Sequence, residues 1–132
     1  MRKLLFLSSY FFFASAIFSQ VSAQNDSVPA YIRIGTIPDF TTYKAPDSTL
    51  FTKKNLQKSK PVLLMIFSPD CGHCQNVTTE ILKNIDHFHK VQILMFTWLP
   101  YTEMISFYKT YKILDYPQID LAWDPKYFFL PY

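Results

Sequence analysis

One stretch of the sequence decides the fold: Pro61-Val62-Leu63-Leu64-Met65-Ile66-Phe67-Ser68-Pro69-Asp70-Cys71-Gly72-His73-Cys74. Its first half is a continuous apolar run, bounded by a proline on one side and by Ser68-Pro69-Asp70 on the other. Such a run is typical of a strand that is buried on both faces of a sheet. Its second half contains two cysteines that are separated by two residues, a C-x-x-C motif.

The residues after the motif predict a helix followed by a second strand. Apolar side chains recur at steps of three and four residues, which places them on one face of a helix that begins near Cys71; they are Cys74, Val77, Ile81, Ile85 and Phe88. Residues 91–97 form a second apolar run. Two buried strands joined by a helix make a βαβ unit, so the strands should be parallel with a right-handed crossover.

The flanking segments complete one α/β domain. Before the motif, we expect an edge strand over residues 31–40, a loop or hairpin tip over residues 43–49 and a short helix over residues 52–59 with Thr52 as its N-cap. After residue 97, Thr102 should cap a second helix, whose apolar face carries Met104, Phe107, Tyr108 and Tyr111. Residues 119–123 alternate like a strand and end at a turn over residues 124–126.

Residues 1–23 have the pattern of a secretory signal peptide. Arg2 and Lys3 precede an apolar run over residues 4–18, and the small residues Val21 and Ala23 stand where a signal peptidase needs them. The run is shorter than the 18 or so residues that a membrane span needs, which disfavours the alternative of an uncleaved anchor. The mature domain would cover residues 24–132 and work in the bacterial cell envelope, in the periplasm or as a secreted protein.

Composition excludes several classes of protein. Apolar residues make up 49% of the 132 residues and charged residues 17%, so the chain is not a disordered tail, and it is too short for several domains. The net charge is +3, and 11 basic against 10 acidic residues follow residue 23. A nearly neutral domain gives no electrostatic reason to expect nucleic acid as a partner.

The spacing of Cys71 and Cys74 favours redox chemistry over a structural role. A disulfide between positions i and i+3 closes a very short loop, so it restrains little of the unfolded chain. A zinc finger is disfavoured because His87 and His89 are too close together, and haem attachment fails because Gln75 stands where it needs a histidine. We therefore expect no metal and no cofactor besides a Cys71–Cys74 disulfide.

The expected helix start should make Cys71 the reactive thiol. A helix N-terminus stabilises a negative sulfur, and His73 would add a hydrogen-bond donor or partial positive charge. The carboxylate of Asp70 would raise the pKa of the Cys71 thiol, and the sequence does not show which of these opposing effects is larger. Cys74 lies one turn deeper on the apolar face, so it should stay protonated and act second.

Three features of the sequence resemble the thioredoxin superfamily. Residues 34–40, Ile-Gly-Thr-Ile-Pro-Asp-Phe, are similar to the opening shared with the peroxiredoxin-like branch, in which a glycine is followed closely by Pro-Asp-Phe. The strand that leads into the C-x-x-C motif and the strand over residues 91–97 match the family in the same order. The combination is most similar to exported bacterial thioredoxin-like proteins, the group that includes the cytochrome c maturation reductases.

The resemblance implies a thioredoxin-like fold with a central mixed sheet flanked by helices. It implies that Cys71 and Cys74 are catalytic and that Gly72 and His73 tune the site, because this dipeptide is the one seen in protein disulfide isomerases and points to an oxidising couple. Its partners would be protein thiols and disulfides, with a membrane electron donor if the protein acts as a reductase.

The sequence departs from its relatives at several positions. Thioredoxins carry a buried acid and a tryptophan where Met65 and Asp70 stand here, so the proton acceptor for Cys74 is unassigned and water is the substitute. Pro69 lies two residues before Cys71, and the threonine that peroxiredoxins need is missing. Peroxidase activity is therefore the weaker alternative.

The family also places a cis-proline opposite its disulfide. Pro117 is one candidate for it. Alternatively, residues 115–132 resemble the insert that precedes the cis-proline in the exported branch, and then the cis-proline, two strands and the last helix are missing and the domain is truncated at its C-terminus. The second interpretation is the favoured one.

The sequence thus predicts an exported thiol–disulfide oxidoreductase that acts on protein disulfides or dithiols. The direction of electron flow stays open. The main alternative is a non-catalytic thioredoxin-like binding module in which Cys71 and Cys74 form an inert structural disulfide.

Overall fold

The computed structural model describes residues 35–130. The predicted signal peptide, and residues 31–34 of the predicted edge strand, lie outside the described residues. The regular elements are β1 (Thr41–Lys44), β2 (Thr49–Thr52), β3 (Val62–Ile66), α2 (Gly72–Lys83), β4 (Gln92–Thr97), α3 (Tyr101–Thr110) and β5 (Ile119–Trp123). Short 3₁₀ turns occupy Lys53–Asn55, Ile85–Phe88 and Ile113–Asp115. In the described residues, no helix has the length and apolar character needed to cross a membrane.

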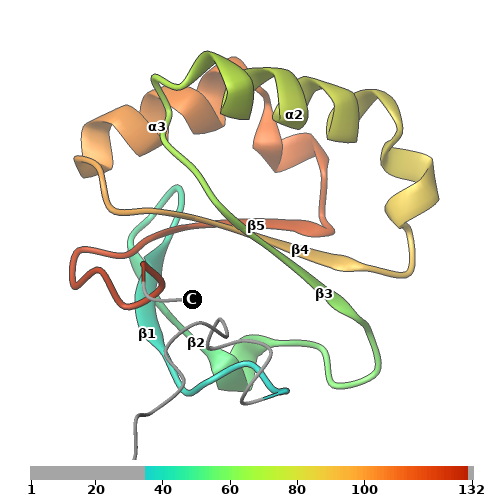
Figure 1. Cartoon of the computed structure of the whole chain (residues 1–132), viewed down its shortest axis with the longest axis vertical. Helices are drawn as coiled ribbons and strands as arrows, with labels where there is room; N and C mark the ends of the chain where they lie inside the picture. Colours follow the sequence, from blue (N-terminus) through green and yellow to red (C-terminus); the bar gives the residue numbers. More distant parts are fainter. Residues whose placement is uncertain (1–34, 131–132) are drawn as a thin grey trace, which may run out of the picture.

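The strands form one mixed sheet with the order β2-β1-β5-β4-β3. Strands β3, β4 and β5 are parallel, whereas β1 pairs antiparallel with both β2 and β5. Helix α2 connects β3 to β4 and helix α3 connects β4 to β5, and both helices lie on the same side of the sheet (Figure 1). The predicted parallel β-α-β unit and the thioredoxin-like α/β fold are thus confirmed.

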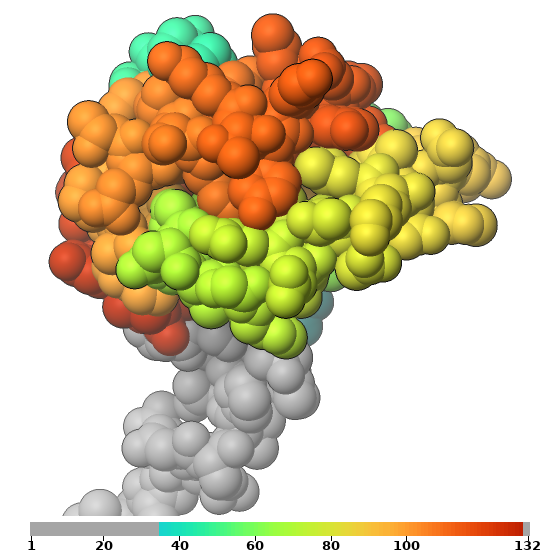
Figure 2. All heavy atoms as spheres, turned by 90° about the horizontal axis from the view of Figure 1, so that it is seen from above, coloured from blue at the N-terminus to red at the C-terminus, as the bar shows by residue number. Residues whose placement is uncertain are grey.

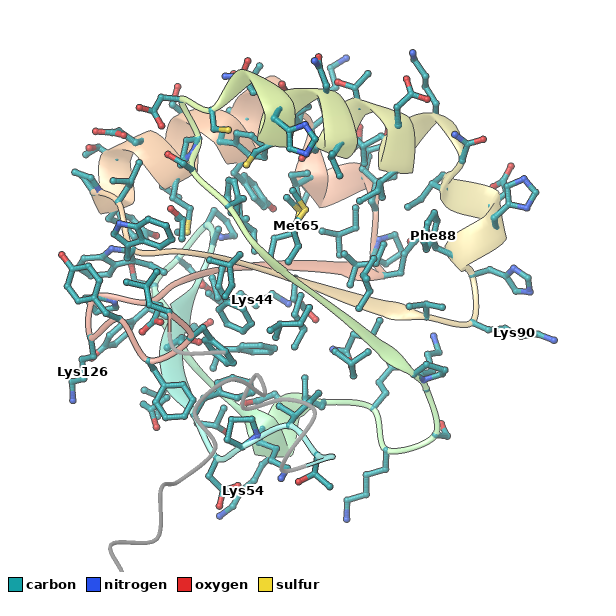
Figure 3. All side chains as sticks on the ribbon, in the orientation of Figure 1. Lys44, Lys54, Met65, Phe88, Lys90 and Lys126 are labelled. Carbon is teal, nitrogen blue, oxygen red and sulfur yellow. The ribbon has the colours of Figure 1, made fainter. Side chains whose placement is uncertain are left out.

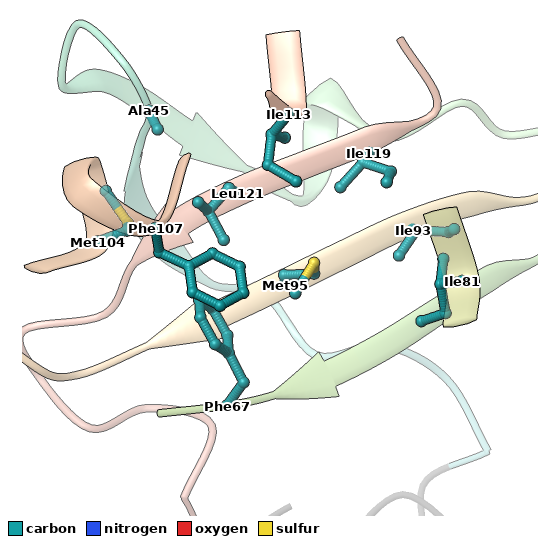
Figure 4. Packing of buried hydrophobic residues seen from close by; sticks show 10 residues of the cluster. All are labelled: Ala45, Phe67, Ile81, Ile93, Met95, Met104, Phe107, Ile113, Ile119 and Leu121. Atoms are coloured by element: carbon teal, nitrogen blue, oxygen red, sulfur yellow. The ribbon is translucent and has the colours of Figure 1, made fainter. Parts of the chain in front are cut away.

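The core is divided by the sheet into two layers. On the helix side, apolar residues of the strands pack against α2 and α3, and Figure 4 shows Phe67, Met95 and Leu121 among them. On the opposite side, the packed residues are largely aromatic; they are Phe40, Phe51, Leu94, Phe96, Ala122 and Phe129. Every residue of β4 is buried, which explains why its sequence shows no alternation of apolar and polar residues.

Strand β3 is less buried than its sequence predicts. It pairs with β4 on one side, and among residues 35–130 no strand pairs with its other edge. Leu63 is accordingly 37% exposed. The expectation of a strand buried on both faces therefore holds in full for β4 and in part for β3.

Two predictions about the N-terminal half differ from the structure. Within the predicted edge strand, residues 35–40 form no strand, and the chain enters the sheet at Thr41. Gly35 has a φ of +63° and Pro38 has no N–H to donate to a strand ladder, so this segment is unsuited to pairing. The loop predicted over residues 43–49 is the turn of the β1–β2 hairpin, whose strands reach further into it than expected.

Of the two predicted threonine caps, Thr52 is confirmed and Thr102 is wrong. The helix expected over residues 52–59 is the single turn Lys53–Asn55, with Thr52 as its N-cap. The Thr52 N–H and hydroxyl both donate to Oδ1 of Asn55, at 2.8 and 3.0 Å. Helix α3 begins at Tyr101 and has Pro100 at the cap position, so Thr102 lies inside the helix. A proline is compatible with a helix start because its missing N–H would have no partner there.

Candidate redox-active site

The C-x-x-C motif lies where the chain leaves β3 and enters α2. Cys71 is the N-cap residue of α2, and Cys74 belongs to its first turn. Both are half-buried free thiols. The strand is anchored just before the motif by Phe67, whose N–H donates to the Phe96 oxygen and whose ring lies 4.7 Å from that of Phe107. The end of the central sheet thus fixes the start of the helix.

Hydrogen bonds hold the loop between strand and helix. The N–H of Cys71 donates to the Ser68 oxygen at 3.1 Å, and the Ser68 hydroxyl donates to the Asp70 carboxylate. Nε2 of Gln75 reaches back to the Pro69 oxygen at 2.8 Å. Sequence reasoning missed the roles of Ser68 and Gln75; their proximity to the motif was the one available signal.

The helix start lowers the pKa of the Cys71 thiol. The largest cause is the backbone N–H of Cys74 in the first turn of α2; the Cys74 thiol and the His73 N–H act in the same direction, whereas desolvation of the sulfur raises the pKa. These N–H groups have no partner within the helix, so they are free to stabilise a thiolate at the N-cap. The charge of Asp70 raises the pKa of Cys71, but it is the smallest of the contributions. The competition that the sequence left open therefore favours the thiolate.

Gly72 and His73 occupy the first two positions of α2. The His73 side chain is exposed, and the residue acts on Cys71 through its backbone N–H. Gly72 is the first residue of α2, and a Cβ built there would meet no atom within 4 Å. Neither space nor backbone conformation requires a glycine at this position.

Burial raises the pKa of Cys74, so this thiol keeps its proton. The hydrogen bond and charge of Cys71 add to the effect, whereas the Ser68 N–H opposes it. Cys74 and Met65 pack against the same helix-side core, and Figure 3 shows Met65 directed from β3 toward the helices. A thioether accepts no proton, so Met65 cannot serve as the proton acceptor for Cys74 that the buried acid provides in thioredoxins.

In the part of the chain that the structure describes, no three His, Cys, Asp or Glu side chains gather in a group that could hold a metal ion.

The proposal of Pro117 as the cis-proline is wrong. Within residues 35–130 the cis peptide bond is Ala45–Pro46. Pro117 precedes β5, whereas Cys71 follows β3, and the register pairs Leu63 with Ile93 and Ile93 with Ile119. Because these strands are parallel, Pro117 lies at the opposite end of the sheet from the motif.

Several known proteins are similar to this chain in sequence or in structure. A probable protein disulfide-isomerase A6 from Medicago sativa is 29% identical over 91 residues, which are 66% of this chain and 24% of that protein. A candidate electron transfer protein from Aquifex aeolicus VF5 superposes with a TM-score of 0.55 at 24% identity, over 64% of this chain and 53% of the other. Arabidopsis thaliana ScoI, solved with copper bound, gives a TM-score of 0.52 at 16% identity, over 65% and 56%.

The chain therefore spans about a quarter of the length of the isomerase that it matches and about half that of the similar structures. The thioredoxin family model matches residues 42–128, which include both helices, the C-x-x-C motif and all of the sheet except Thr41. On the strength of that match, this chain belongs to the thioredoxin family.

Proposed function

We propose that this chain is an exported thiol–disulfide oxidoreductase that acts on protein disulfides or dithiols. The observation that carries the proposal is the placement of two thiols at the start of one helix: Cys71 is the N-cap of α2, where the pKa of its thiol is lowered, and Cys74 lies in the first turn, where burial raises the pKa. A thiolate is the nucleophile in disulfide exchange, and a protonated second thiol remains available to complete it. Family membership and the similarity to a disulfide isomerase support the same chemistry.

In the reducing direction, the Cys71 thiolate attacks one sulfur of a substrate disulfide. A Cys71–substrate disulfide forms, and the substrate disulfide breaks to release one thiolate. Cys74 then loses its proton to solvent and attacks the Cys71 sulfur, which releases the second substrate thiolate and leaves a Cys71–Cys74 disulfide. Two electrons pass from the protein to the substrate. Oxidation of a substrate dithiol runs the same steps backwards.

The thiolate-stabilising environment supports an oxidising couple, because stabilising the reduced form raises the reduction potential. Titration of the purified protein in glutathione buffers, with both thiols trapped at each step, gives the midpoint. A value near about −180 mV would indicate an oxidant or isomerase, and a value near or below about −270 mV a reductase that needs a membrane donor. If the Cys71–Cys74 disulfide is never reduced under native conditions, the catalytic proposal is refuted and the disulfide is structural.

The predicted signal peptide supports a site of action in the periplasm or outside the cell. Cleavage after Ala23 would give a mature chain that begins at Gln24. The intact mass of the protein recovered from a bacterial periplasmic fraction tests this directly. Recovery of the uncleaved chain in the cytoplasm would contradict it, without bearing on the redox chemistry.

A further inference from the structure

A groove lies between the active-site loop and helix α3. One of its walls is formed by Pro69, Asp70 and Gln75, from the loop and the first turn of α2. Asp70 directly precedes Cys71, so the groove begins one residue away from the reactive thiol. In Figure 2, which views the helix side of the molecule, the green to yellow-green start of α2 lies beside the orange α3.

The other wall belongs to α3 and the residue that ends it. Glu103, Phe107 and Tyr111 line it at intervals of four residues, which places them on one face of the helix. The Phe107 ring is buried and lies 4.3 Å from the half-buried ring of Tyr111. Phe107 thus forms the floor of the groove, and the ring that remains accessible to a ligand is that of Tyr111.

The charges at this groove are all of one sign. Asp70 and Glu103 are exposed, and the described residues that line the groove include no lysine or arginine. Lys109, the basic residue of α3, is six positions from Glu103 and therefore lies on another side of the helix. Two exposed carboxylates and the half-buried Tyr111 ring line the same groove, and such a set attracts a cation through the charge of the acids and the electron-rich face of the ring.

Neither carboxylate identifies a ligand by itself, because an acid near a helix start is favourable in any case. Asp70, however, opposes the chemistry next to it: its charge raises the pKa of Cys71 and so works against the thiolate. Thiol activation therefore gives no reason for an acid at this position. The carboxylate also accepts a hydrogen bond from the Ser68 hydroxyl, but a neutral asparagine could accept that hydrogen bond as well, so the bond does not account for the negative charge. The position of this charge on the same groove as Glu103 points instead to recognition of the substrate.

Resting on the proposed function, we propose that this groove is a specificity subsite for a basic side chain, Arg or Lys, beside the reacting cysteine of a polypeptide substrate. The bound residue takes no part in the covalent steps. It holds the substrate so that the substrate sulfur lies near the sulfur of Cys71.

Peptides whose single cysteine is joined by a disulfide to thionitrobenzoate provide the probe. The Cys71 thiolate attacks the peptide sulfur, because thionitrobenzoate is the better leaving group, and the released thionitrobenzoate absorbs visible light. Peptides with Arg before the cysteine or after it are compared with matched Gln and Glu peptides. We expect one Arg peptide to react about three- to tenfold faster than its Gln counterpart, as one exposed ion pair and one cation–π contact allow.

Variants locate the effect. Glu103→Gln should bring the Arg-to-Gln rate ratio close to one, whereas Glu80→Gln, which removes the same charge from the exposed side of α2, should leave it unchanged. Asp70→Asn should change two rates in opposite directions: alkylation of Cys71 by neutral iodoacetamide at pH 6–7 should rise, while the Arg preference falls. A role of Asp70 confined to the thiol would move the alkylation rate alone.

Two failures are distinguishable. If no peptide reacts faster with the protein than with its Cys71→Ser variant, the proposed function itself is wrong. If the Gln peptides react but neither Arg peptide is preferred, or if the preference survives both Glu103→Gln and Asp70→Asn, the oxidoreductase stands and the subsite is refuted.

Discussion

The side chain of Gln75 reaches back across the motif to Pro69: its Nε2 donates a 2.8 Å hydrogen bond to the proline backbone oxygen. Gln75 lies one turn into α2, and Pro69 lies in the loop before it. The bond therefore ties the loop that carries Asp70 to the helix that carries Cys74. It makes the loop and the helix start one unit, and its removal should be measurable.

We expect Gln75→Ala to lower the free energy of unfolding by about 0.5–1.5 kcal/mol, the net value of one hydrogen bond. Gln75→Glu should cost more, because a carboxylate cannot donate to the Pro69 oxygen and its charge opposes the nearby thiolate. Urea unfolding of the reduced protein measures both, with the exposed neighbour substitution Asn76→Ala as the control. Equal effects of Asn76→Ala and Gln75→Ala would show that the Pro69 contact contributes nothing.

The lowered pKa of Cys71 should appear in the pH dependence of its alkylation. The rate with iodoacetamide should reach half of its maximum below the pH of about 8.5 that an ordinary thiol shows. Cys74→Ala should raise this midpoint because the thiol donor is lost, yet leave it below the ordinary value because the backbone N–H remains. Cys74→Ser keeps a donor and should lie closer to the parent protein. An unchanged midpoint in Cys74→Ala would contradict the contribution of that thiol.

The same pKa shift links stability to pH in the reduced protein. Folding lowers the pKa of Cys71, so the thiolate adds stability that is fully present above the unfolded thiol's pKa and is lost as pH falls through the folded pKa. Urea midpoints measured across that range should decline toward low pH in the reduced protein. The Cys71→Ser variant should lack this component of the decline, and identical profiles for the two proteins would refute the linkage.

Phe67 should be the apolar residue near the motif whose loss costs most. It is 1% exposed, and its ring packs against Phe107 beneath the start of the active-site loop. Phe67→Ala should destabilise the protein by about 3–5 kcal/mol, a large fraction of the stability of a small domain. Leu114→Ala, at a side chain that is 75% exposed, should fall within about 0.5 kcal/mol of the parent. Chemical denaturation of both variants checks the contrast, and comparable losses would contradict the packing.

A buried polar network should be the second sensitive point. The Asp120 carboxylate accepts a 2.8 Å hydrogen bond from Nε2 of Gln92 and pairs with Lys44. Asp120→Ala leaves the buried Gln92 donor without this acceptor, so we expect a loss of about 1–3 kcal/mol in the free energy of unfolding. Asp120→Asn keeps an acceptor oxygen, so it should lower the free energy of unfolding by less. Asp115→Ala, which removes an exposed acid, is the control. If Asp120→Ala were as stable as Asp115→Ala, the network would have no net value.

Local patterns predicted the elements that depend on neighbouring residues. The apolar run before Cys71, the three- and four-residue periodicity after it and the alternation over residues 119–123 each describe one strand or helix facing a core, and all three elements are present. The same logic placed Cys71 at a helix start and Cys74 on its buried side. The ends of the elements were predicted less accurately. The start of α3 depends on Pro100 and the absence of a strand before Thr41 on Pro38, and each proline acts through its one missing N–H rather than through a repeating pattern.

The sequence by itself therefore predicted the parallel β-α-β unit and the position of the two thiols on it, since two apolar runs separated by a helical pattern leave one favoured way to pair the strands. The tertiary structure alone decided what depends on distant segments. It placed Pro117 at the far end of the sheet from Cys71, and it brought Glu103 to the loop that carries Asp70. It also gave the direction of the competition at the Cys71 sulfur, because the N–H groups of the first helical turn lower the pKa of Cys71 more than the solvated carboxylate of Asp70 raises it.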